Sequence, residues 1–124
     1  MAKILIIDDE PGILLMYGDR LKGSGHVAIT AKNGEEGVAI AKKEKPDLIF
    51  LDIIMPKVNG LDVLKQLKSE PETKDIPVYI STNLPEDSSG IDAEKIGAAG
   101  YLVKAQVEPA QFDQIIASAL KVKK

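Results

Sequence analysis

Two apolar stretches of the chain each end abruptly in carboxylate side chains. Residues 4–7 lead directly into Asp8 and Asp9, and residues 48–51 lead directly into Asp52. If both stretches are neighbouring parallel strands, their carboxyl ends meet at the crevice where open α/β sheets bind ligands. At an effective dielectric constant of about 20, two unit charges roughly 4 Å apart repel by about 4 kcal/mol, so such a group either protonates or holds a cation. The sequence therefore predicts an acidic site suited to a metal ion.

The elements that must position these acids follow from the apolar pattern. Five short apolar runs alternate with segments of helical period, which favours βαβ units and a parallel sheet. Right-handed crossovers then imply a compact three-layer sandwich whose site lies at the carboxyl edge of the sheet. The predicted strands are residues 4–7, 27–30, 48–51, 78–81 and 101–103. Four predicted helices run from Pro11 to about Gly23, over 35–43, from Asn59 or Gly60 to about 69, and from about Pro109 onward. Another, the fourth in chain order, is less certain in extent: residues 84–90 delay it, and Ile91 and Ile96 form its weak apolar stripe.

Length and composition narrow the class of protein. The 124 residues fit one domain, which we expect to comprise residues 1–124. Because the chain has no cysteine, disulfides and thiolate metal ligands are excluded. The balance of 16 basic and 19 acidic residues lacks the positive footprint of a protein that binds nucleic acid directly. No apolar stretch approaches the roughly 20 residues that span a bilayer, so we expect a cytoplasmic protein without a membrane partner.

Four strand ends carry chemical groups in a recognisable order. They are the acidic run at residues 8–11, the Leu51-Asp52-Ile53-Ile54-Met55-Pro56 run, the strand ending in Ser81 and Thr82, and the strand running from Gly100 through Tyr101 to Lys104. With these motifs, the chain resembles the receiver domain of two-component response regulators across essentially its whole length. The resemblance implies a flavodoxin-like fold, in which a five-stranded parallel sheet of order 2-1-3-4-5 is flanked by five helices.

The resemblance also implies a reaction and its metal ion. Asp52 would accept a phosphoryl group from a histidine kinase or phosphotransfer protein, forming an acyl phosphate. Mg²⁺, or Mn²⁺ in its place, would be held by Asp9, Asp52 and the backbone carbonyl of Ile54, with Asp8 acting through water. Such a protein is a signalling phosphoacceptor that catalyses only its own phosphorylation and dephosphorylation, and is not an enzyme in the ordinary sense.

Three further residues take their roles from the same resemblance. Lys104 would pair with one phosphoryl oxygen, and the Thr82 hydroxyl would donate to another. Ser81 competes for the hydroxyl role, but strand alternation points it to the opposite face from Thr82. Tyr101 would be the aromatic switch that moves inward on phosphorylation. The expected output is a changed surface over the fourth helix, fifth strand and fifth helix, where an effector, an output domain or a second copy of the chain would dock.

Three alternatives are weighed against this interpretation. A degenerate receiver would keep the fold and act as a phosphorylation-independent interaction module. A phosphohydrolase with an aspartate nucleophile, of the haloacid dehalogenase type, is disfavoured because that chemistry needs a second aspartate where Ile54 stands. A flavodoxin-like cofactor binder is disfavoured because Asp8, Asp9 and Glu10 would repel a phosphate group unless a metal ion intervened.

Overall fold

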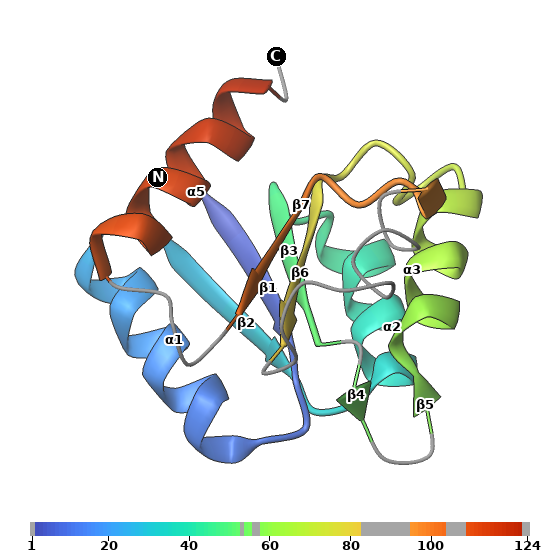
Figure 1. Cartoon of the computed structure of the whole chain (residues 1–124), viewed down its shortest axis with the longest axis horizontal. Coiled ribbons are helices and arrows are strands. Elements are labelled where there is room, and N and C mark those ends of the chain that lie inside the picture. The colour runs from blue at the N-terminus through green and yellow to red at the C-terminus, as the bar shows by residue number, and fades with distance from the viewer. Residues whose placement is uncertain (1, 53, 56–57, 83–94, 104–108, 123–124) are drawn as a thin grey trace.

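A computed structural model describes residues 2–52, 54–55, 58–82, 95–103 and 109–122 of the chain. Within these ranges strands and helices alternate along the chain, as the apolar pattern predicts (Figure 1). The elements are β1 (Lys3–Ile7), α1 (Pro11–Gly23), β2 (Val27–Ala31), α2 (Gly34–Glu44), β3 (Leu48–Leu51), β4 (Ile54–Met55), β5 (Val58–Asn59), α3 (Gly60–Ser69), β6 (Val78–Thr82), β7 (Gly100–Val103) and α5 (Pro109–Val122).

The central feature is a five-stranded parallel sheet of order β2-β1-β3-β6-β7. This order is the predicted 2-1-3-4-5 arrangement, with β6 and β7 as the fourth and fifth strands, and it is confirmed. β1 and β3 are internal strands on which every residue from Ile4 to Ile7 and from Leu48 to Leu51 is buried. Continuous apolar runs of this kind are expected where helices cover both faces of a parallel sheet.

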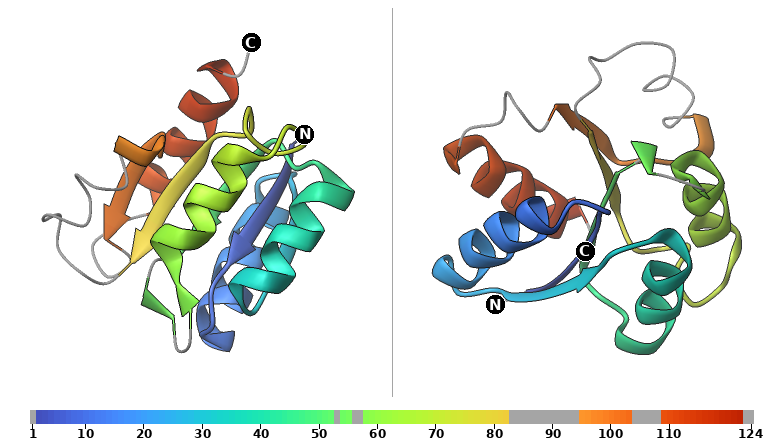
Figure 2. Two further views of the ribbon diagram at one scale, coloured as in Figure 1. Left: turned by 90° about the vertical axis from the view of Figure 1, so that its right-hand side faces the viewer. Right: turned by 90° about the horizontal axis from the view of Figure 1, so that it is seen from below.

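Helices pack against both faces of the sheet and complete the three layers (Figures 1 and 2). On the face covered by α2 and α3, the buried side chains are aliphatic, and we call it the aliphatic face; its buried members include Leu5, Ile7, Val38, Ile49, Leu51, Val63, Leu64, Leu67 and Ile80. On the face covered by α1 and α5, rings join the aliphatic side chains, and we call it the aromatic face; its members include Ile4, Ile6, Tyr17, Leu21, Phe50, Phe112 and Ile116, with Tyr79 partly buried beside them.

Local signals in the sequence explain where several helices begin and end. Pro11 is the first residue of α1, a position at which its fixed φ and missing N–H cost nothing. The Asn33 side chain accepts a hydrogen bond from the backbone N–H of Glu36 at 2.7 Å and so caps α2. After α3, the Lys68 ammonium donates to the carbonyl of Ile76 at 2.7 Å, which ties the helix end to the turn before β6. Half burial lowers the pKa of Lys68, against an opposing effect of Asp75.

The predicted elements agree closely with those observed. All five predicted strands are present, with ends displaced by no more than one residue. Four of the five predicted helices lie in the described ranges as α1, α2, α3 and α5; the fourth falls mainly on residues 83–94, outside those ranges, with Lys95 and Ile96 helical at its end. The antiparallel pair of β4 and β5, which precedes α3, was not predicted. No helix in the described ranges has the length and apolar character needed to cross a membrane.

Candidate functional site

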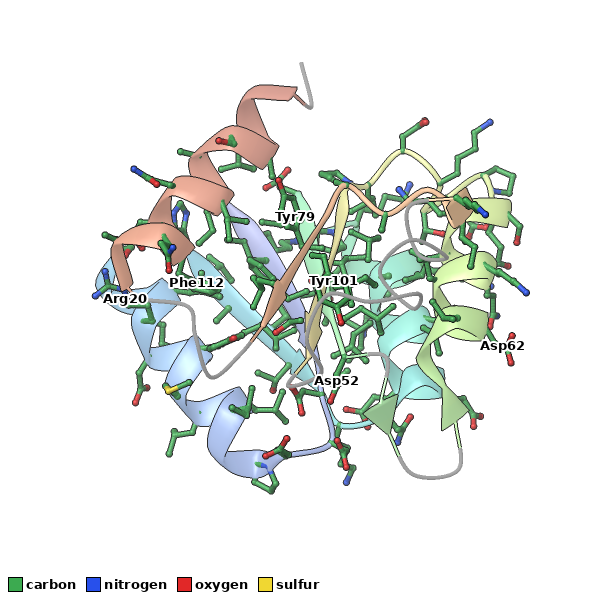
Figure 3. The ribbon with its side chains drawn as sticks, viewed as in Figure 1. Arg20, Asp52, Asp62, Tyr79, Tyr101 and Phe112 are labelled. Atoms are coloured by element: carbon green, nitrogen blue, oxygen red, sulfur yellow. The ribbon has the colours of Figure 1, made fainter. Side chains whose placement is uncertain are left out.

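The order of the sheet brings two buried acids to the same edge. Because β1 and β3 pair in parallel with Ile7 opposite Leu51, the residues that follow them, Asp8 and Asp52, emerge side by side. The Asp52 backbone N–H donates to the carbonyl of Ile7 at 2.9 Å, so the strand pairing extends to Asp52 itself. Asp8 is 1% exposed and Asp52 is 3% exposed. In Figure 3, Asp52 lies at the lower end of the sheet, the end at which β4 and β5 are found in Figure 1.

A third carboxylate, that of Glu10, completes the cluster. Oxygen atoms of Asp8, Glu10 and Asp52 all lie within 4.8 Å of one another. The Asp8 carboxylate accepts a hydrogen bond from the Glu10 backbone N–H at 2.9 Å, which holds the start of α1 close to the strand end. At this spacing the mutual repulsion amounts to several kcal/mol unless it is neutralised. Carboxylate oxygens are the ligands that Mg²⁺ prefers, so the donor set fits a divalent cation of this kind.

The acidic cluster in the structure contains two of the three acids that the sequence predicts. Asp8 and Asp52 come together as expected. Asp9 is partly buried and lies outside the three-acid cluster, so its role as a ligand stays a prediction. Glu10 belongs to the acidic run but had not been assigned a ligand role. Glu10 is the N-cap residue of α1, immediately before Pro11, and this position shows only that it lies near the end of β1.

Of the other predicted site residues, the structure places the backbone of Ile54, Thr82 and Tyr101. Ile54 begins the β4–β5 pair two residues after Asp52, opposite Asn59. Thr82 is the last residue of β6, which pairs with β3. Tyr101 is partly buried in β7 and packs against the aliphatic face, opposite Ile80 in register. The side chain of Thr82 and the whole of Lys104 lie outside the described residues, so their roles stay predictions.

Ser81 points to the other side of the sheet, as strand alternation predicts. Its hydroxyl is buried and lies 3.3 Å from the Tyr17 hydroxyl on α1. This contact engages Ser81 on the aromatic face, whereas Ile80 packs in the core of the aliphatic face. Ser81 is thus occupied elsewhere, which favours its neighbour Thr82 for the hydroxyl role at the acidic edge.

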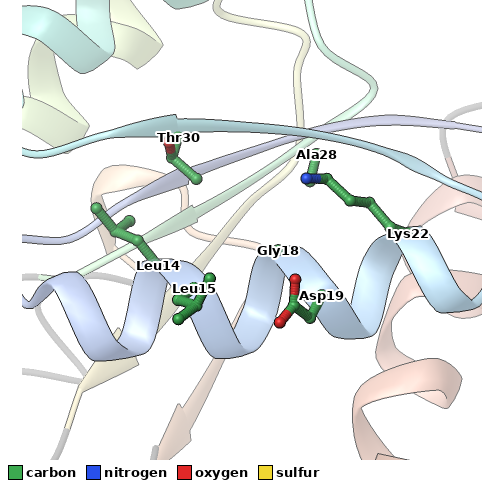
Figure 4. A pocket seen from close by; sticks show the side chains of 7 residues that line it. All are labelled: Leu14, Leu15, Gly18, Asp19, Lys22, Ala28 and Thr30. Atoms are coloured by element: carbon green, nitrogen blue, oxygen red, sulfur yellow. The ribbon is translucent and has the colours of Figure 1, made fainter.

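A hollow of about 310 Å³ lies apart from the acids, between α1 and β2 (Figure 4). Leu15, 66% exposed, and the edge-strand residue Thr30 border it. Its lining comprises Leu14, Leu15, Gly18, Asp19, Lys22, Ala28 and Thr30. The lining mixes apolar side chains with those of Asp19, Lys22 and Thr30, and it contains none of the predicted site residues.

A doubly wound α/β sheet with a carboxylate cluster at the ends of two adjacent internal strands defines a class of α/β domains whose acidic site suits a divalent cation. The family follows from comparison: a family model described as the response regulator receiver domain matches residues 4–117. The chain belongs to this family of two-component signalling domains. Receiver domains are phosphoacceptors that bind Mg²⁺ at an acidic cluster and interact with histidine kinases or phosphotransfer proteins and with output domains. The pocket of Asp8, Glu10 and Asp52 fits magnesium binding and aspartyl phosphorylation.

Individual relatives agree with this assignment. Protein PilH of Pseudomonas aeruginosa is 40% identical over 104 residues, which cover 84% of this chain and 86% of PilH. The probable transcriptional regulator ycf27 of Porphyra purpurea is 40% identical over 119 residues; this chain spans about half, 47%, of its length. Among solved structures, the chemotaxis protein CheY4 of Vibrio cholerae matches with a TM-score of 0.90 at 29% identity, covering 97% of this chain and 99% of CheY4.

Proposed function

We propose that this chain is the phosphoacceptor module of a two-component system and that Asp52 receives a phosphoryl group from the histidine of a kinase or phosphotransfer protein. The observation that carries the proposal is the clustering of Asp8, Glu10 and Asp52 within 4.8 Å at the carboxyl edge of the sheet. A buried carboxylate beside other acids suits a nucleophile whose incoming phosphoryl charge is neutralised by a bound cation. We assign residues 1–124 to this one domain and place it in the cytoplasm.

The proposed ligands of Mg²⁺, or of Mn²⁺ in its place, are Asp9, Asp52 and the backbone carbonyl of Ile54, with Asp8 acting through water. Bound metal would neutralise negative charge on the phosphoryl oxygens. The pairing of Ile54 with Asn59 supports this set, because it fixes the backbone two residues beyond the nucleophile. Glu10 adds a further negative charge to the cluster from the start of α1.

In the proposed transfer, an oxygen of Asp52 attacks the phosphorus of a phosphohistidine. A new P–O bond forms as the P–N bond breaks, and the imidazole nitrogen of the partner keeps the electron pair and later takes a proton. Lys104 pairs with one phosphoryl oxygen and the Thr82 hydroxyl donates to another, so charge is spread over fixed groups in the transition state. Hydrolysis of the acyl phosphate returns Asp52 to its carboxylate form.

The proposed output is conformational. Thr82 drawn toward the phosphoryl group and Tyr101 moving inward would bias a two-state equilibrium. Thr82 lies on β6 and Tyr101 on β7, and the pairing of these two strands supports a coupled movement of the two residues. The surface that changes comprises the predicted fourth helix, β7 and α5, where an effector, an output domain or a second phosphorylated copy would dock.

The central experiment is intact mass spectrometry after incubation with acetyl phosphate and Mg²⁺. We expect wild type to gain one phosphoryl group and Asp52→Asn to gain none, because the amide is not a nucleophile toward phosphorus. Asp19→Asn, on the outer surface of α1, is the matched control and should label as wild type does. Labelling of Asp52→Asn, or no labelling of wild type, would contradict the proposal and would favour a phosphorylation-independent module.

The metal site can be tested without phosphorylation. We expect calorimetric titration with Mg²⁺ to give at least about tenfold weaker binding for Asp52→Asn and for Asp9→Asn, since each removes a charged ligand. Glu10→Gln should weaken binding less than either, because Glu10 is exposed and its charge is screened by solvent. A larger loss for Glu10→Gln than for Asp9→Asn would transfer the ligand role to Glu10.

A further inference from the structure

One buried polar contact connects α1 to the end of β6. The hydroxyl oxygens of Tyr17 and Ser81 lie 3.3 Å apart, and these residues are 64 positions apart in the chain. Tyr17 is 3% exposed and Ser81 is 2% exposed. Among the described hydrogen bonds between two side chains, this is the one that is buried. A buried hydroxyl pair in an otherwise apolar layer is a directional contact, because each group depends on the position of the other.

The Tyr17 ring is held firmly by its neighbours. Its centroid lies 4.8 Å from that of Phe112 on α5 and 6.2 Å from that of Phe50 on β3, the latter in an edge-to-face arrangement. Phe50 and Phe112 in turn stack on each other with centroids 4.9 Å apart. Rings packed in this way leave the Tyr17 hydroxyl little freedom, so α1, α5 and β3 together fix the point to which Ser81 is bonded.

Ser81 is the residue directly before Thr82, at the end of the strand that neighbours β3 and Asp52. A movement of Thr82 toward a phosphoryl group on Asp52 must carry the peptide that joins the two residues. The separation of 3.3 Å is already long for a bond between hydroxyls, so a displacement of a few tenths of an ångström away from Tyr17 breaks it. The bond therefore opposes movement of the end of β6.

We propose that Tyr17 is a positioning residue for phosphoryl transfer, holding the end of β6, and with it Thr82, in the resting arrangement through Ser81. This inference rests on the proposed function, because it concerns the residue that would contact the phosphoryl group. Through this hydrogen bond, α1, which packs on the aromatic face, restrains the end of β6. Loss of the restraint raises the fraction of molecules in which Thr82 is positioned for transfer.

The test is the rate of phosphorylation by acetyl phosphate at saturating Mg²⁺, followed by intact mass. Tyr17→Phe keeps the ring in the aromatic layer and removes the hydroxyl, and Ser81→Ala removes its partner. We expect each variant to label about two to three times faster than wild type, because a hydroxyl pair as far apart as 3.3 Å contributes at the lower end of the ordinary net range for a hydrogen bond. The double variant should be no faster than the faster single variant, because both remove the same contact.

A matched control separates this role from ordinary packing. Tyr79→Phe removes another hydroxyl from a ring of the aromatic face, one that lies 6.2 Å from Phe50, and should leave the labelling rate unchanged. A purely structural role for Tyr17 would lower the melting temperature and leave the rate as in wild type. If Tyr17→Phe and Ser81→Ala label at the wild-type rate or more slowly, the inference is overturned. The proposed function still holds in that case, provided that wild type is labelled. Wild type that takes up no phosphoryl group would overturn both.

A second measurement uses the wild-type chain and does not depend on variants that fold. The ¹³Cζ resonance of a tyrosine reports the hydrogen bonding of its hydroxyl, and the three tyrosines of the chain make it assignable. We expect the Tyr17 resonance to shift when beryllium fluoride and Mg²⁺ together occupy the acidic site as a phosphoryl mimic. A Tyr17 resonance that stays in place while that of Tyr101 moves would contradict the restraint.

Discussion

The two faces of the sheet are built differently, although the same strands contribute to both. The aliphatic face packs branched side chains closely against α2 and α3. The aromatic face packs Tyr17, Phe50, Tyr79 and Phe112 against one another and contains the buried hydroxyl pair. Aliphatic packing is governed by volume, whereas ring and hydroxyl contacts also depend on orientation. The aromatic face therefore contains the directional contact that, in the proposed switch, breaks when β6 shifts.

The largest effect is expected where the rings meet. Phe50 contacts three other rings, and Phe50→Ala should lower the free energy of unfolding by about 4 kcal/mol, from lost burial, a cavity and lost ring contacts. Ile49→Ala, the next residue on the same strand but on the aliphatic face, should cost about 3 kcal/mol. Urea unfolding of the two variants measures the comparison. A smaller loss for Phe50→Ala would mean that the aromatic face relaxes around the missing ring.

Glycines give a second comparison, because the tightness of packing differs between helices. A Cβ at Gly37 in α2 would lie 2.5 Å from Ile7 Cδ1, whereas one at Gly18 in α1 meets no atom within 4 Å. Gly37→Ala should therefore destabilise the chain by about 2 kcal/mol in spite of alanine's better helix propensity. Gly18→Ala should stabilise it by about 0.5 to 1 kcal/mol. Thermal unfolding measures both changes in stability. Changes of the same sign in Gly37→Ala and Gly18→Ala would contradict the predicted difference.

The smallest effect concerns the outer rim of the aliphatic face. The Glu70 carboxylate accepts a hydrogen bond from Lys42 at 2.6 Å and raises the pKa of Lys42 above its ordinary 10.5. The folded state thus holds this proton more tightly than the unfolded state, so the contribution is complete below pH 10.5 and is lost as the pH rises through the raised value. Wild type should exceed Lys42→Met in stability at neutral pH and low salt, with the difference narrowing above pH 10.5. Lys43→Met, at the exposed neighbouring residue that takes part in none of the described ion pairs, is the control and should leave stability at neutral pH and low salt close to that of wild type.

Much of this arrangement follows from the sequence because it depends on short-range signals. The runs that became β1 and β3 are apolar throughout, Pro11 marks the first turn of α1, and Asp8 and Asp52 follow their strands directly. With the strand order 2-1-3-4-5 that the family resemblance implies, parallel pairing brings these two strand ends together, so the sequence predicts that the two acids meet.

Other features depend on distances that no local pattern encodes. The contact between Tyr17 and Ser81 joins α1 to β6 across 64 positions of the chain. Helical spacing alone predicts only that the Tyr17 ring faces the core. The place of Glu10 in the acidic cluster depends on the angle at which α1 leaves β1. The β4–β5 pair consists of strands of two residues each, and such strands are too short for the alternation of apolar and polar residues to be recognised in the sequence.

The position of β1 between β2 and β3 has a consequence for synthesis of the protein. Its partners both come later in the chain, so its backbone groups cannot all be paired until Leu51 has been added. At ordinary rates of translation this delay is on the order of seconds. During that interval the apolar residues Ile4 to Ile7, which later lead into Asp8 of the acidic cluster, lack the partner strands that bury them.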